Sequence, residues 1–150
     1  MIPRTHMSAA LIEAKASWTR GEVPVGAVVV SPSGMIVSRA GNRTREYSDP
    51  TAHAEMLALR AACAANGSER LPDHSLFVTL EPCPMCAAAI AAARIKVLYY
   101  AASDPKSGGV AHGARIFSHA QCHHRPDVFE GLMEQDASDL LKRFFAERRA

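Results

Sequence analysis

Two short motifs contain the residues of this chain that are best suited to chemistry, His53-Ala54-Glu55 and Pro82-Cys83-Pro84-Met85-Cys86. Imidazole and thiolate are ligands that zinc prefers, and a catalytic zinc site combines three protein ligands with an open position for water. His53, Cys83 and Cys86 supply three such ligands, and the carboxylate of Glu55 remains unused by the metal. We therefore predict a zinc site with Glu55 beside it as the carrier of protons.

Zinc lowers the pKa of a coordinated water toward about 7, and a nearby carboxylate can take the released proton and deliver it to a substrate. The alternatives are a structural zinc site or no metal. A structural site needs four protein ligands, and the chain has no second C-x-x-C pair. A histidine could in principle be the fourth ligand, the candidates being His112, His119, His123 and His124. The free carboxylate and the open position together favour catalysis.

The two cysteines fall at the predicted start of a helix. Cys83 and Cys86 are three positions apart, so their sulfurs can share one helical face. Pro84 suits the first helical position, where no backbone N–H is required. The positive end of the helix dipole stabilises thiolates, so this location favours metal binding.

His53 also lies at a predicted helix start, after Asp49-Pro50-Thr51, with Thr51 as the expected N-cap. Residues two apart on a regular helix point in different directions. His53 and Glu55 can therefore both reach the metal site only if His53 lies in the irregular first turn.

Apolar periodicity and turn residues predict an alternation of helices and strands. The predicted helices span 8–20, 53–66, 84–93 and 136–148, and the predicted strands span 26–30, 35–40, 75–79, 95–101 and 127–129. The first two strands form an antiparallel hairpin, and the strand–helix alternation after them implies right-handed crossovers and a parallel region. We expect one domain over residues 1–150, a three-layer α/β/α fold with a mixed five-stranded sheet.

The composition, with 48% hydrophobic and 21% charged residues, is that of a soluble globular protein. The net charge of +2 does not by itself indicate a nucleic-acid-binding protein, so such binding would need a local basic patch. No apolar stretch approaches the roughly 20 residues that span a bilayer, and no secretory signal is apparent. We expect a cytoplasmic protein without a membrane segment.

Two of the four cysteines lie outside the metal motif. Cys63 is expected to be a buried thiol in a helix. Cys122 has histidines close by, at positions 119, 123 and 124, and could suggest a second metal site. Their spacing matches no standard structural zinc pattern, which favours a loop with incidental histidines.

The combination H-x-E followed by P-C-x-x-C is the signature of zinc deaminases. The segments 49–55 and 79–86 closely resemble the bacterial tRNA-specific adenosine deaminases, the TadA group of the cytidine-deaminase-like superfamily. The resemblance covers nearly the whole chain and includes the segments 22–27, 41–43, 102–109 and 144–149. It implies a cytidine-deaminase-like fold.

The resemblance also implies an activity: hydrolysis of the wobble adenosine of tRNA to inosine, usually in the arginine tRNA with an ACG anticodon. It implies a bound zinc ion (Zn2+), a homodimer, and an anticodon stem-loop as the partner. Carried over by position, Asn42 would contact the flipped nucleoside and Asp104 would lie in the loop that holds neighbouring nucleotides. Three basic residues would approach the RNA phosphates, namely Lys106, Arg148 and Arg149.

Each of these contacts has a simpler interpretation. Asn42 and Asp104 have the character of ordinary turn residues, and the basic residues could merely solvate a terminal helix. Two other functions also remain open. One is a deaminase of free bases or nucleosides such as guanine, because the zinc chemistry is the same. The other is a non-catalytic RNA-binding module stabilised by zinc, against which Glu55 argues.

Overall fold

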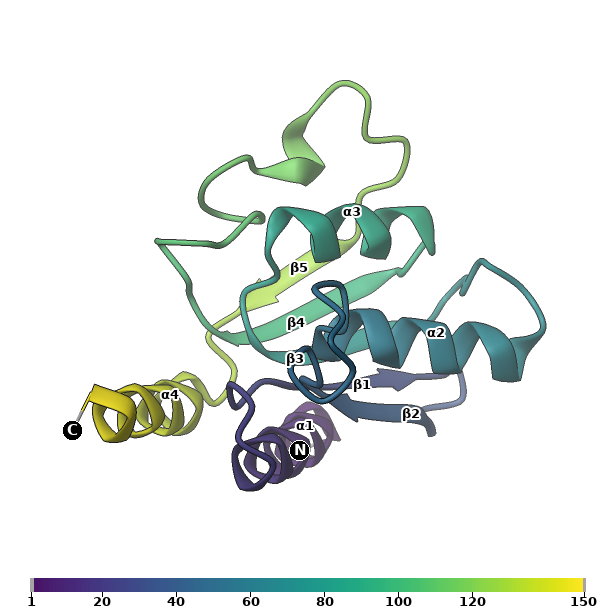
Figure 1. Ribbon diagram of the computed structural model, residues 1–150. Coiled ribbons are helices and arrows are strands. Elements are labelled where there is room, and N and C mark those ends of the chain that lie inside the picture. The colour runs from purple at the N-terminus through teal and green to yellow at the C-terminus, as the bar shows by residue number, and fades with distance from the viewer. Residues whose placement is uncertain (1, 150) are drawn as a thin grey trace.

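The computed structural model describes the backbone of residues 2–149 and the side chains of residues 3–148. One five-stranded sheet lies between two layers of helices (Figure 1). In spatial order its strands are β2 (Ile36–Gly41), β1 (Gly26–Val30), β3 (Ser75–Leu80), β4 (Val97–Ala102) and β5 (Asp127–Glu130). The predicted three-layer α/β fold with a mixed sheet is confirmed.

Strand β1 is antiparallel to both of its neighbours, whereas β3, β4 and β5 run parallel. All five residues of β1 are buried, as expected for a Val-rich strand covered on both faces. A turn that contains Gly34, with φ of +91°, connects β1 to β2. After β2 the chain forms a helix, α2 (Ala54–Asn66), and then β3. Since β1 lies between β2 and β3 in the sheet, this connection passes over β1.

Two helices cover each face of the sheet (Figure 1). On one face lie α2 (Ala54–Asn66) and α3 (Pro84–Ala92), and on the other lie α1 (Ile2–Thr19) and α4 (Glu134–Arg149). A short 3-10 helix, Ile116–Ser118, packs near α3. None of the helices in the described part of the chain is long and apolar enough to cross a membrane.

Two helices begin earlier than predicted. Helix α1 starts at Ile2 instead of residue 8. Pro3 does not prevent this, since it falls in the first turn, where its missing N–H breaks no hydrogen bond. Helix α4 starts at Glu134 instead of residue 136. Its early acidic residues, Glu134 and Asp136, suit the positive end of the helix dipole.

The functional elements meet at one edge of the sheet. Strand β3 ends at Leu80, just before the segment that opens α3, and β4 ends at Ala102, just before the loop that contains Asp104. Because β3 and β4 are parallel, both of these segments leave the sheet on the same side. Helix α2 also begins there, so the two predicted metal-binding motifs come together.

Candidate metal centre and active-site cavity

His53 is the N-cap residue of α2, with an extended backbone at φ −74° and ψ 154°. This is the irregular position that allows its ring and the side chain of Glu55 to serve the same site. The expectation that Thr51 would cap the helix is wrong, because its hydroxyl donates to Asp49 Oδ1 at 2.7 Å. The first N–H of the helix, on Ala54, instead donates to Asn42 Oδ1 at 2.9 Å.

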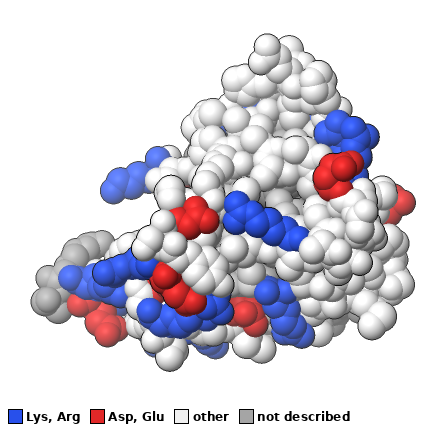
Figure 2. All heavy atoms as spheres, turned by 45° about the vertical axis from the view of Figure 1, so that its right-hand side comes forward, with Lys and Arg blue, Asp and Glu red and all other residues white. Residues whose placement is uncertain are grey.

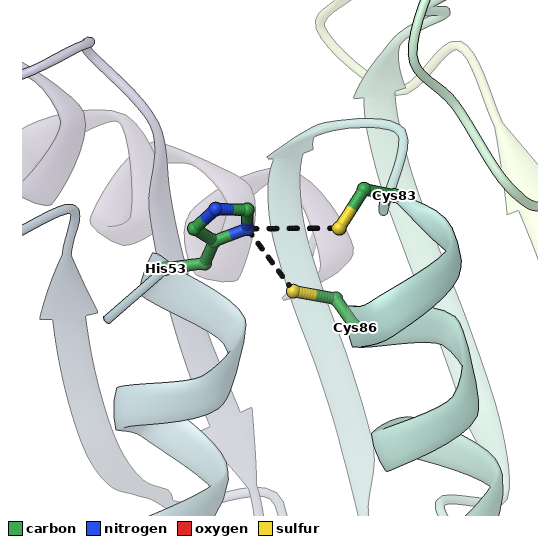
Figure 3. A group of neighbouring side chains, drawn as sticks. All are labelled: His53, Cys83 and Cys86. Carbon is green, nitrogen blue, oxygen red and sulfur yellow. Dashed lines mark hydrogen bonds between the residues drawn. The ribbon is translucent and has the colours of Figure 1, made fainter. Parts of the chain in front are cut away.

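The two cysteines open helix α3. Cys83 is its N-cap, with an extended backbone, and Pro84 follows as the first helical residue. Nδ1 of His53 lies 3.6 Å from Sγ of Cys83 and 3.4 Å from Sγ of Cys86 (Figure 3). For Zn–N and Zn–S bonds of about 2.0 and 2.3 Å at tetrahedral angles, nitrogen and sulfur would be about 3.5 Å apart.

These three ligand atoms all lie within 4.8 Å of one another, and they form the only such group found among the described residues. Their separations and their chemistry both fit zinc. The three side chains come from two helix starts on one face of the sheet, and all point toward a common centre (Figure 3). His53, Cys83 and Cys86 are therefore positioned to hold a metal ion.

A hydrogen bond links the two sulfurs. The hydrogen bond between them lowers the pKa of the Cys83 thiol to about 4 and raises the pKa of the Cys86 thiol, which burial raises further. The hydrogen bond with Cys83 also raises the pKa of the His53 ring. Zinc binding requires neutral imidazole and deprotonated sulfur, so a bound ion would displace these protons.

Glu55 lies in the first turn of α2 and is only 4% exposed. Burial raises the pKa of its carboxyl to about 7. A carboxyl group with such a pKa can both accept and donate a proton near neutral pH, as general acid–base catalysis requires. Glu55 provides no atom to the group of three ligands.

A cavity of about 240 Å³ adjoins the ligands. Its walls include His53, Glu55 and Cys83 from the centre, with Asn42 and Asp104 from two loops. The other lining residues are Val23, Val25, Thr44, Leu80, Glu81 and Ser107. The structure thus brings two of the five predicted substrate-binding residues to the same cavity as the predicted zinc ligands.

The other predicted contacts lie outside this cavity. Lys106 borders a neighbouring hollow of about 470 Å³, which shares Asp104 and Ser107 with the first. Arg148 lines a different hollow, where its guanidinium donates to Gly21 O at 2.8 Å. Arg149 is the last residue of α4, and its side chain lies outside the described part of the structure.

Two buried acids were not among the predicted site residues: Glu81, which lines the cavity, and Glu22, which lines the hollow that contains Arg148. Glu22 accepts hydrogen bonds from the backbone N–H groups of Arg45 and Glu46, at 3.2 and 2.8 Å. Glu81 similarly accepts hydrogen bonds from the loop that begins at Asp104. Burial raises the pKa of the Glu81 carboxyl, but the hydrogen bonds that it accepts, first that from the Asp104 N–H, outweigh this effect, and the pKa lies below its usual value. A sequence signal existed for Glu81, since an acid immediately before the zinc motif that is not a ligand requires another role.

The remaining cysteines follow the simpler interpretation of their sequence context. Cys63 is partly buried and packs against the hydrophobic core. Cys122 donates from Sγ to the carbonyl oxygen of His124 at 3.0 Å. Ring nitrogens of two nearby histidines are paired with backbone carbonyls, His119 with Ala114 and His124 with Ile95, both at 2.6 Å.

Residues 2–102 match the model of the family described as cytidine and deoxycytidylate deaminase zinc-binding region. Together with the fold and the three converging ligands, this match shows that the chain belongs to that zinc-dependent deaminase family. Within it, the chain is 55% identical over 150 residues to the tRNA-specific adenosine deaminase of Agrobacterium fabrum, covering 99% of this chain and 98% of that protein.

Solved structures show the same relationship. A structure from work on A-to-I editing by tRNA:A34 deaminases at the wobble position of transfer RNA superimposes with a TM-score of 0.89 at 55% identity. It covers 91% of this chain and 99% of its own. Guanine deaminase from Bacillus subtilis is more distant, with a TM-score of 0.66 and 32% identity over 97% of this chain and 93% of its own.

Proposed function

We propose that this protein hydrolyses adenosine to inosine at the wobble position of tRNA and releases ammonia, the arginine tRNA with an ACG anticodon being the expected substrate. The observation that carries the proposal is that the ligand group of His53, Cys83 and Cys86 adjoins a cavity into which Glu55 also faces, with His53, Glu55 and Cys83 in its wall. The 55% identity to a tRNA-specific adenosine deaminase supports the choice of substrate.

The size of the cavity supports a single base as the reacting group. Its volume of about 240 Å³ lies below the roughly 300–1,000 Å³ typical of pockets that enclose drug-sized ligands. Enzymes that modify a base take it out of the stack into a small pocket, at a cost that is low for a loop nucleotide. The rest of the anticodon loop would then lie on the surface around the cavity.

Zinc, when bound, supplies a Lewis acid that acidifies water at neutral pH. The residues of the chain do the rest. His53, Cys83 and Cys86 would hold the ion, and Glu55 would take a proton from a water molecule and deliver it to N1 of the adenine. The water oxygen bonds to C6 as the bond from C6 to the amino group breaks, and the amino group leaves with the second water proton as ammonia. Asn42 and Asp104, on two sides of the cavity, would orient the nucleoside and its neighbours.

The RNA backbone would meet a surface of mixed charge. On the face shown in Figure 2, basic and acidic side chains are interspersed over the lower part, a further basic and acidic group lies at the upper right, and the top is uncharged. Glu46 pairs with Arg43 at 2.7 Å and with Arg20 at 3.7 Å, so part of the positive charge is internally balanced. We keep three basic residues as the proposed phosphate contacts, Lys106, Arg148 and Arg149. Such contacts would set the register of the bound RNA.

The direct test measures ammonia release from an anticodon stem-loop that carries a wobble adenosine, with guanine, adenosine and cytidine in parallel. We expect deamination of the stem-loop and little or none of the free compounds. A stem-loop with guanosine at the wobble position is the matched control. Deamination of guanine without turnover of the stem-loop would reject the proposal in favour of a free-base deaminase.

The assembly that we propose is a homodimer. Helix α3 leaves small exposed residues, Ala88 and Ala92, beside Ile116 and Cys122 at a hollow of about 530 Å³. Small side chains allow close approach of a second backbone. Sedimentation equilibrium should give twice the chain mass of 16.1 kDa, and Ala88→Glu should shift the measured mass toward that of the monomer.

A tRNA substrate would place the enzyme in the cytoplasm.

A further inference from the structure

Glu81 is a buried acid whose side-chain hydrogen bonds all go to one loop. It follows β3 directly, precedes Pro82-Cys83, and is only 2% exposed. Its Oε1 accepts from the backbone N–H of Asp104 at 3.0 Å and from Nδ1 of His112 at 2.7 Å. Its Oε2 accepts three further backbone N–H groups, from Val110, Ala111 and His112 at 3.2, 3.0 and 3.2 Å.

The loop 104–112 is shaped to surround this carboxylate. Asp104 caps the following turn, because its Oδ1 accepts from the N–H groups of Lys106 and Ser107. Gly108 approaches so closely that a Cβ atom there would collide with Oε2 of Glu81. The N–H of Gly109 donates to Pro82 O at 2.8 Å, which fixes the loop to the segment that opens α3.

The same loop forms one wall of the active-site cavity. Asp104 and Ser107 line it together with His53, Glu55 and Glu81. Both carboxylate oxygens of Glu81 are engaged by donors of the loop, so Glu81 is suited to hold the loop and not to exchange protons with a substrate. Glu55, by comparison, is the acid beside the ligands of the metal.

We propose that Glu81 is a positioning residue that fixes the 104–112 loop as the substrate-binding wall and thereby sets the affinity for the RNA. The proposal rests on the proposed function for its substrate. A carboxylate is needed because every partner is a donor. In Glu81→Gln, one oxygen becomes an NH2 group that must face at least one backbone N–H, whichever way the amide is turned.

The test compares Glu81→Gln with Ser38→Ala, a matched control that removes another buried hydrogen bond, from Ser38 Oγ to Ala58 O at 2.8 Å, away from the loop. Hydrogen exchange of the amides at 104 and 110–112 measures the state of the loop without any substrate. We expect these amides to lose protection in Glu81→Gln and to keep it in Ser38→Ala. Unchanged protection in Glu81→Gln would overturn the proposal.

Kinetics with the stem-loop separate positioning from catalysis. For Glu81→Gln we expect KM to rise roughly tenfold or more, with kcat within about threefold of the original and zinc content unchanged, because binding contacts common to ground and transition states are lost. Glu81→Asp, which keeps the charge on a shorter side chain, should give an intermediate KM. Loss of zinc, or a fall in kcat with KM constant, would overturn the proposal.

Two further points keep the test decisive. If Glu81→Gln does not fold, His112→Ala removes only the ring donor and should raise KM in the same direction by a smaller factor, and an unchanged KM would count against the proposal. If the unmodified protein fails to deaminate the stem-loop, the proposed function is rejected. The exchange experiment then still decides whether Glu81 holds the loop.

Discussion

Asn42 Oδ1 accepts a hydrogen bond from the backbone N–H of Ala54 at 2.9 Å. This bond ties the segment after β2 to the first turn of α2, immediately between His53 and Glu55. The amide of Asn42 also donates to Val23 O at 3.1 Å, so its orientation is fixed from both ends. Asn42 can therefore present its remaining donor and acceptor positions to a substrate in a set direction while it caps the helix.

Replacement of Asn42 should reveal both roles. Asn42→Ala removes a helix cap, which costs about 1 kcal/mol and should lower Tm by roughly 2–4 °C. Asn42→Asp retains an acceptor for the Ala54 N–H and should lose less stability, yet it should lose activity on the stem-loop as Asn42→Ala does. Thermal unfolding and steady-state kinetics of the two variants make the comparison. Equal Tm values for the two would contradict the capping role.

Removal of the Glu55 carboxylate should separate metal binding from turnover. In Glu55→Ala and Glu55→Gln we expect the rate to fall by roughly 10²–10⁴ or more, because general acid–base catalysis is lost. Zinc should remain bound, since its three ligands are untouched. Metal analysis and ammonia release from the same sample provide the measurement. Near-normal activity in either variant would show that another group moves the proton.

Gly109 lies against the start of α3, and its replacement should disturb the metal centre. A Cβ at this position would lie 2.5 Å from Pro84 N and 2.8 Å from the carbonyl carbon of Cys83. Gly109→Ala should therefore shift the Cys83 segment, with a loss of roughly 1–3 kcal/mol of stability and weaker zinc retention against a chelator.

The matched control for this substitution is Gly67→Ala. Gly67 has φ of +70°, and a Cβ added there would have no neighbour within 4 Å, so only backbone strain of about 1–2 kcal/mol is expected. Its zinc retention should equal that of the unmodified protein. Equal zinc loss in both variants would mean that general destabilisation, not the contact with Pro84, releases the ion.

Arg148 should contribute to RNA affinity through its charge. Its guanidinium lies 4.7 Å from the centre of the Phe144 ring and donates to Gly21 O, so its position is set by the protein. We expect Arg148→Ala to weaken stem-loop binding and to reduce the slope of log K against log salt by about 1. Lys96→Ala, just before β4 and paired with Asp73 at 3.9 Å, is the control that should leave the slope unchanged. An unchanged slope for Arg148→Ala would remove it from the set of phosphate contacts.

The sequence predicted most of the architecture because its signals are local. The positions of the strands follow from Val-rich segments bounded by Pro or Gly. The three-residue spacing of Cys83 and Cys86 predicts that their sulfurs lie on one face of α3. His53 does occupy the irregular first turn that its spacing from Glu55 requires. Such inferences need only the geometry of one element.

Features that depend on distant contacts were not predictable in this way. Thr51 has the residue type of a cap, yet its hydroxyl donates to Asp49 Oδ1. The N–H of Ala54 in the first turn of α2 donates instead to Asn42 Oδ1, which belongs to a different segment. The roles of Glu22 and Glu81 require knowledge of which loops fold back onto them. The separation of Arg148 from the cavity likewise depends on where α4 crosses the sheet.

Helices α2 and α3 both start at the metal centre and end at the opposite edge of the sheet, where the turns after Asn66 and Ala92 meet. There Leu71 N donates to Ala93 O at 2.7 Å and Lys96 N donates to His74 O at 2.9 Å. The two helices thus carry the metal-binding residues at their first turns, and the backbone hydrogen bonds that join the segments following them lie at the opposite ends. Of the two distal turns, the one after Asn66 has exposed residues at 67–70, so we expect peptide insertions or fusion tags to be accommodated there while the reactive end keeps its geometry.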